Sequence, residues 1–77
     1  MSKLPKLSGP EIIKALSKLG FVKKRQKGSH AILVKKTKER KIGCVVPLHK
    51  ELATGTLKGI LRQAKVDQEE FLKTLEK

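Results

Sequence analysis

The sequence has few aromatic residues, and this argues against one common way of holding a nucleic acid. Phe21 and Phe71 are the only residues among Phe, Tyr and Trp, whereas proteins that hold single strands by base stacking use several aromatic rings. Acidic residues are also scarce, because 7 Asp and Glu stand against 19 Lys and Arg, a net charge of +12. Such an excess favours an anionic partner, most often nucleic acid and less often an anionic membrane surface. We therefore expect contacts with phosphates rather than base stacking.

The chain also lacks a second cysteine and any long apolar run. Cys44 cannot form a disulfide within the chain, we interpret it as a small buried apolar residue, and no Cys and His residues have zinc-ligand spacing. No segment approaches the roughly 18 apolar residues of a membrane span, and the first residues do not resemble a signal peptide. These absences predict a cytoplasmic protein with no cofactor. The length of 77 residues predicts a single small domain, 1–77.

Capping and turn signals predict one helix followed by a three-stranded meander. After a loose lead-in at residues 1–7, the sequence Ser8-Gly9-Pro10-Glu11 predicts a capped helix over 9–19, which Gly20 ends. Short turns then separate predicted strands at 21–26, 29–36 and 41–46. The second of these is a continuous apolar run that fits a central strand, and Pro47 closes the third.

Two further helices are predicted after a loop at residues 48–55. Thr54 is the expected N-cap of the first, and Gly59 within that helix suggests close packing against the sheet. Asp67 and Glu70 form a capping-box pattern that opens the second, whose inward residues are expected to be Phe71, Leu72 and Leu75. The predicted fold class is α+β, an α-β-β-β-α sandwich with helices on one face of an antiparallel sheet and a short extra C-terminal helix.

His30 follows a turn, Lys27-Gly28-Ser29, and begins the central strand. An imidazole that titrates near neutral pH, in a strongly cationic setting, suits general acid–base cleavage of a polyanion. The alternative is a half-buried strand histidine with a satisfied hydrogen bond, and from the residues alone this alternative is favoured. His49 is a secondary catalytic candidate, and an ordinary exposed loop histidine is an equally good interpretation of it.

The basic residues fall into two groups. One group leads into His30: Lys23, Lys24, Arg25 and Lys27. The other surrounds the second predicted turn: Lys35, Lys36, Lys38, Arg40 and Lys41. Any one of these is most simply a solvated charge, but the excess as a group indicates phosphate binding.

Several segments in this order resemble the HicA-like (YcfA-like) family of small ribonuclease toxins over about residues 7–75. They are Leu7-Ser8-Gly9 with Glu11-Ile12-Ile13, Leu19-Gly20-Phe21, Arg25-Gln26-Lys27-Gly28-Ser29-His30, Val46-Pro47 with His49, Glu51-Leu52, Gly55-Thr56-Leu57 and Ile60-Leu61. The Gly-Ser-His segment alone would be a weak signal, but these segments together are a specific one.

The resemblance implies a fold similar to the double-stranded-RNA-binding domain and metal-independent cleavage of mRNA. It implies that His30 is catalytic, that Gly28 and Ser29 shape its turn, and that a HicB-type antitoxin is the protein partner. Together with the charge pattern, it predicts RNA contacts at Lys23, Lys24, Arg25, Lys27, Gly28, Ser29, Lys35 and Lys36. The sequence departs from the family at Ala31, where a bulkier or polar residue is common, and at Gly43-Cys44, which is expected to interrupt the third strand. A non-catalytic RNA-binding module and a non-enzymatic DNA or nucleoprotein accessory protein remain the competing functions.

Overall fold

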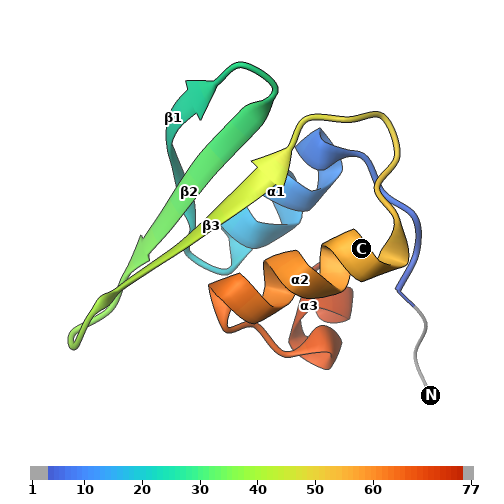
Figure 1. The fold of residues 1–77 in the computed structure, drawn as a ribbon. Coiled ribbons are helices and arrows are strands. Elements are labelled where there is room, and N and C mark those ends of the chain that lie inside the picture. The colour runs from blue at the N-terminus through green and yellow to red at the C-terminus, as the bar shows by residue number, and fades with distance from the viewer. Residues whose placement is uncertain (1–3, 76–77) are drawn as a thin grey trace.

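The three strands form one antiparallel sheet, and the helices pack on one of its faces (Figure 1). The computed structural model describes residues 4–75. Its elements are α1 (Gly9–Lys18), β1 (Val22–Lys27), β2 (His30–Lys36), β3 (Lys41–Pro47), α2 (Thr54–Ala64) and α3 (Gln68–Thr74). The strand order is β1-β2-β3. The α+β fold with its extra C-terminal helix is therefore confirmed.

The start of α1 is built as the capping box predicts. The Glu11 backbone N–H donates to Ser8 Oγ at 3.2 Å, and the Ser8 backbone N–H donates to Glu11 Oε1 at 2.9 Å. These hydrogen bonds from Ser8 lower the pKa of the Glu11 carboxyl. Ile12, Ala15 and Leu16 are buried on the inner side of the helix. Gly20, with a φ of +101°, follows the helix where a left-handed residue is wanted.

The core lies between the sheet and the helices. Ala31 and Leu33 of β2 are fully buried, and their partners on β3, Val46 and Cys44, are buried beside them. The predicted interruption of the third strand at Gly43-Cys44 is wrong, because β3 pairs with β2 without a break from Lys41 to Pro47. The pairing Val34↔Gly43 leaves that glycine on the uncovered face, where its small size causes no defect in the core.

β1 has a different environment from the other two strands. All six of its residues are exposed, since it lies at the edge of the sheet beyond the helices (Figure 1). Its pairing with β2 shifts between Lys23 and Arg25, so Lys24 is the extra residue of a β-bulge.

Some predicted details of the two C-terminal helices are wrong. The N-cap of α2 is Ala53, and Thr54 is already helical. A Cβ at Gly59 would meet no atom within 4 Å, so close packing does not explain this glycine. Asp67 is the N-cap of α3, but its side chain makes no capping hydrogen bond. Phe71 is fully buried, whereas Leu75 is 37% exposed rather than inward.

The predicted lead-in at 1–7 lies partly outside the described residues. Within 4–7 the chain forms neither helix nor strand, yet Leu4 is buried in the core. Among the described residues there is no helix both long and apolar enough to span a bilayer.

Candidate active site

A tight turn places His30 at the first position of β2. Lys27 pairs with His30 across the two residues Gly28 and Ser29. Gly28 has a φ of +60° and Ser29 has no positive φ, which is the pattern of a type II′ hairpin turn. A Cβ at Gly28 would meet nothing within 4 Å, so the backbone conformation, not space, selects glycine here. The Gln26 side-chain amide donates to the Gly28 carbonyl at 3.3 Å and thereby braces the turn.

The His30 side chain is exposed, not half-buried. Among the hydrogen bonds of residues 4–75, none involves the imidazole of His30 or of His49. The alternative of a half-buried strand histidine with a satisfied hydrogen bond is therefore wrong.

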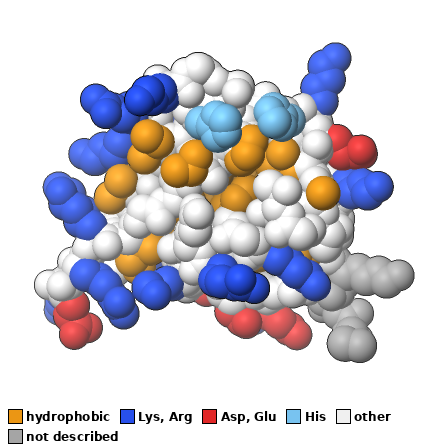
Figure 2. Space-filling model, viewed as in Figure 1, with side chains coloured by type: hydrophobic (Ala, Val, Ile, Leu, Met, Phe, Trp, Pro, Cys, Tyr) orange, Lys and Arg blue, Asp and Glu red, His pale blue; other side chains and the backbone are white. Residues whose placement is uncertain are grey.

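The two histidines lie at neighbouring points of the surface. The Leu48 N–H donates to the Ser29 carbonyl at 2.6 Å, and these are the residues that directly precede His49 and His30. Figure 2 shows both imidazoles on one face of the molecule, close to each other and above a group of hydrophobic side chains. His49 is exposed as well, so both rings are open to a ligand. The sequence does not show whether His49 lies near His30. Because the structure brings the two together, His49 becomes a stronger candidate for the second catalytic group.

The segment that carries His49 is tied to the N-terminal part of the chain. The Gly9 N–H donates to the His49 carbonyl at 2.9 Å, and the Leu52 N–H donates to the Leu7 carbonyl at 2.8 Å. Together with the Leu48–Ser29 bond, these hydrogen bonds attach the loop both to the N-terminal segment and to the turn before β2. His49 thus lies on a loop with a defined backbone, although the loop has no regular secondary structure.

The face of the sheet opposite the helices extends from His30. Side chains alternate along a strand, so Ile32, Val34 and Lys36 share the face of His30, while Ala31 and Leu33 face the helices. Paired residues on neighbouring strands lie on the same face. The pairings therefore add Arg25 and Lys27 of β1 and Lys41 of β3 to the face of His30. We call this set of four cations, Arg25, Lys27, Lys36 and Lys41, the sheet cations.

The strand geometry places the predicted RNA-contact residues on two different faces of the sheet. Lys35 is directed to the helix side, where its Nζ lies 5.9 Å from the centroid of the Phe21 ring. Lys23 pairs with the buried Leu33 and so shares the helix side of the sheet, although no helix covers it. Its Nζ donates to Gln26 Oε1 at 3.2 Å. Of the predicted lysines and arginine, the structure thus brings Arg25, Lys27 and Lys36 to the face of His30, and not Lys23 or Lys35, while Lys24 is the extra residue of the β-bulge.

The charges of the sheet cations are free to bind an external anion. Within the described part of the chain, none of the four side chains pairs with an acidic side chain or donates a hydrogen bond. Each is also exposed. A surface of like charges without internal partners attracts polyanions strongly.

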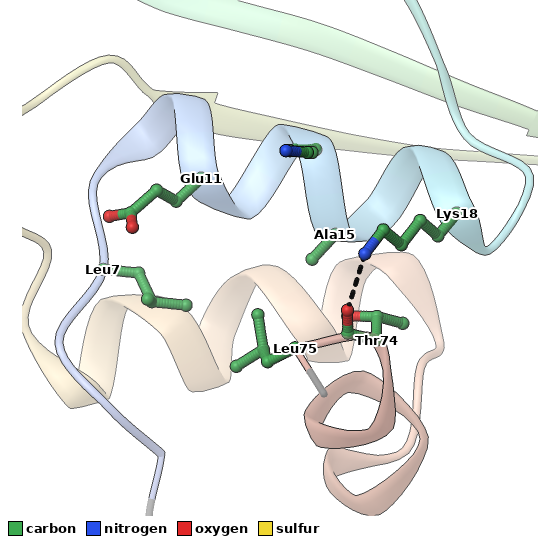
Figure 3. A pocket seen from close by; sticks show the side chains of 7 residues that line it. Leu7, Glu11, Ala15, Lys18, Thr74 and Leu75 are labelled. Carbon is green, nitrogen blue, oxygen red and sulfur yellow. Dashed lines mark hydrogen bonds between the residues drawn. The ribbon is translucent and has the colours of Figure 1, made fainter. Parts of the chain in front are cut away.

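Other candidate sites are less suited to catalysis. Cys44 is buried, and burial raises the pKa of its thiol to about 11, so it is a poor nucleophile. Among the residues that the structure describes, no three His, Cys, Asp or Glu side chains gather as metal ligands would. A groove between α1 and α3 is lined by Leu7, Ala15, Thr74 and other residues but by neither histidine, and Lys18 Nζ donates to the Thr74 carbonyl across it at 2.9 Å (Figure 3).

The sequence places Gly9 at a helix start and in a segment shared with the family, but it does not predict the contact of Gly9 with the His49 segment. A Cβ at this position would meet the Pro47 carbonyl oxygen and would lie 2.8 Å from Leu48 Cα. One local signal exists, because glycine is an unfavourable helix residue and its use just after a serine cap suggests a close approach.

Comparison with known proteins identifies the family of this chain. The model of one family, described as the HicA toxin of bacterial toxin-antitoxin systems, matches residues 9–66, which is more than half of the chain. The matched segment includes α1, the whole sheet with both histidines, and α2. A search of curated proteins found no match. The chain therefore belongs to the HicA toxin family.

Proposed function

We propose that this protein is an endoribonuclease toxin of a type II toxin-antitoxin system, which cleaves mRNA without a metal ion. The observation that carries the proposal is the exposed His30 at one end of the sheet cations, beside His49. A phosphate held at Lys27, the pairing partner of His30, would lie within reach of the imidazole. Membership of a toxin family supports the biological role.

The chemistry that suits these groups uses the nucleophile that RNA already contains. A neutral imidazole accepts the proton of the 2′-hydroxyl while its oxygen attacks the adjacent phosphorus. The bond from phosphorus to the 5′-oxygen breaks, and a protonated imidazole donates a proton to that leaving oxygen. The products are a 2′,3′-cyclic phosphate and a 5′-hydroxyl. Positioned proton transfer of this kind contributes roughly 10²–10⁴ in rate, and nearby cations stabilise the charge that develops on the phosphoryl oxygens.

We assign His30 as the principal acid–base group and His49 as its partner. Two imidazoles beside one phosphate allow one to act as base and the other as acid in the same turnover. The bond between Leu48 and Ser29 supports this pairing, because it fixes the backbones that lead into the two residues.

The experiment that tests this proposal incubates the purified protein with end-labelled RNA in the presence of a chelator. The wild type should produce fragments with cyclic phosphate ends, and His30→Ala should bind the same RNA but leave it intact. A matched RNA with a 2′-deoxy nucleotide at the cleavage position should resist cleavage, because it lacks the nucleophile. Fragments that appear only with added metal, or unchanged cleavage by His30→Ala, would contradict the mechanism.

A specific observation favours a second function, that of a non-catalytic RNA-binding module. Catalytic bases are usually oriented by a further hydrogen bond, and in the described part of the chain neither imidazole receives one. The same assay decides between the two, since tight binding without fragments identifies the module.

The protein partner in this proposal is a HicB-type antitoxin. A domain with a net charge of +12 is best complemented by an acidic surface. Equimolar antitoxin should abolish cleavage, and persistence of cleavage at saturating antitoxin would refute this partner.

A further inference from the structure

α1 approaches the segment that carries His49 more closely than any side chain at position 9 would allow. A Cβ built on Gly9 would meet the Pro47 carbonyl oxygen, and would lie 2.8 Å from Leu48 Cα and 3.0 Å from the Pro47 carbonyl carbon. All of these are backbone atoms, so no flexible side chain can move aside. The φ of Gly9 is not positive, and the requirement for glycine is therefore steric rather than conformational.

The contact is transmitted to both histidines through backbone hydrogen bonds. The Gly9 N–H donates to the carbonyl of His49 itself, and the Leu48 N–H donates to Ser29, directly before His30. A larger residue at position 9 must push residues 47–49 outward, and this moves His49 relative to the turn that carries His30. Proton transfer requires heavy atoms within about 2.6–3.2 Å, so a displacement of this segment is expected to affect the reaction more than the binding of RNA.

We propose that Gly9 is a positioning residue, which sets the separation of the two imidazoles by allowing α1 to pack directly on the 47–49 backbone. This rests on the proposed function, since it assigns Gly9 a role in the same acid–base step. The residue is not catalytic, because it acts through the backbone of His49. None of the sheet cations belongs to the 47–49 segment, because Arg25 and Lys27 lie on β1, Lys36 lies on β2, and Lys41 lies at the end of β3 opposite Pro47.

The test compares Gly9→Ala with Gly59→Ala. Both positions are glycines within helices without positive φ, but a Cβ at Gly59 meets nothing within 4 Å, which makes it a matched control. Gly9→Ala should reduce single-turnover cleavage by roughly 10²-fold, the loss typical of a misplacement of about 1 Å, while RNA affinity stays within about twofold. Gly59→Ala should leave both unchanged. Equal rates for the two variants, or an equal loss in rate and affinity for Gly9→Ala, would overturn the proposal.

A double-mutant cycle separates positioning from general loss of structure. If Gly9 acts through His49, the variant Gly9→Ala/His49→Gln should be no slower than His49→Gln alone. Losses that multiply would show an effect of position 9 independent of His49 and would refute the role.

Measurements that need no cleavage keep the inference distinct from the proposed function. In heteronuclear NMR spectra, Gly9→Ala should shift the imidazole signals of His49, whereas Gly59→Ala should not, even if the wild type cuts no RNA. Unshifted His49 signals would refute the inference. If Gly9→Ala does not fold, hydrogen exchange of the wild-type amides provides the test. The Gly9 and Leu48 amides should exchange more slowly than the amide of the exposed Lys50. Equally rapid exchange at the three positions would contradict the proposed packing.

Discussion

Binding of single-stranded RNA should weaken as the salt concentration rises, and the steepness should follow the number of sheet cations that contact phosphates. Arg25, Lys27, Lys36 and Lys41 offer four phosphate contacts on the face of His30. Each single-strand contact contributes a slope of about −0.7 to log affinity against log salt, so the expected slope is about −2.8. Between about 50 and 200 mM salt, the affinity should therefore fall by roughly 50-fold.

A single substitution isolates one of these contacts. Lys27→Ala should reduce the slope by about 0.7, to about −2.1, and should weaken binding to all sequences alike. Lys58→Ala is the matched control, because Lys58 is also exposed but lies on α2, which packs on the opposite face of the sheet. The control should leave the slope unchanged.

Fluorescence anisotropy of a labelled single-stranded RNA measures these slopes. All variants are prepared with the additional change His30→Ala, so that the ligand stays intact during the titration. If Lys58→Ala lowered the slope as much as Lys27→Ala, the RNA would not be confined to the face of His30. A slope near zero for the parent protein would contradict phosphate binding by these residues.

Three further predictions concern stability. Phe71→Ala should lower the free energy of unfolding by about 3–5 kcal/mol in urea titrations, because the ring is fully buried; a loss below about 1 kcal/mol would contradict its place in the core. Lys65→Gly should raise the free energy of unfolding by about 0.5–1 kcal/mol, since Lys65 has a φ of +56° at the end of α2, and a decrease in melting temperature would refute this. The buried Cys44 thiol keeps its proton up to about pH 11, whereas the unfolded chain releases it above its ordinary pKa of 9.0. Stability should therefore fall as pH rises between these values, and Cys44→Ala should lose that component of the pH dependence.

Local patterns were sufficient to predict most of the fold. The Ser8–Glu11 capping box and the three-stranded meander follow from neighbouring residues, and the structure confirms both. The apolar run 31–34 correctly indicates the central strand, since β2 pairs with both β1 and β3. Helices cover only one of its faces, on which Ala31 and Leu33 are buried, whereas Ile32 and Val34 on the other face are partly exposed.

Details that depend on contacts distant in sequence were not predictable. The interpretation of Gly59 as a packing contact was reasonable for a helix glycine, but it concerned the wrong glycine. Gly9 makes the close approach instead, to residues 38 and 39 positions later in the chain. No periodicity within α1 carries information about Pro47 or Leu48.

The candidate site was predictable in its residues but not in its geometry. The Gly-Ser-His segment identifies His30 as a candidate, yet its exposure depends on which face of β2 the helices cover. Proximity of His49 depends on the Leu48–Ser29 bond, which joins the loop after β3 to the turn between β1 and β2. The face of the sheet on which each lysine lies depends on the strand register and on the bulge at Lys24. The pattern of charges in the sequence predicts neither.

The exposed edge of β1 has a consequence for how this protein behaves in concentrated solution. A strand with a free edge is a template on which a second copy can add a strand, and lysines and bulges are the usual features that prevent such pairing. β1 contains both, in Lys23, Lys24, Arg25 and Lys27 and in its bulge. The residues that are available to phosphates thus also keep copies of the chain apart. Neutralising several of them together should favour strand-to-strand aggregation, which charge reversal to glutamate should avoid.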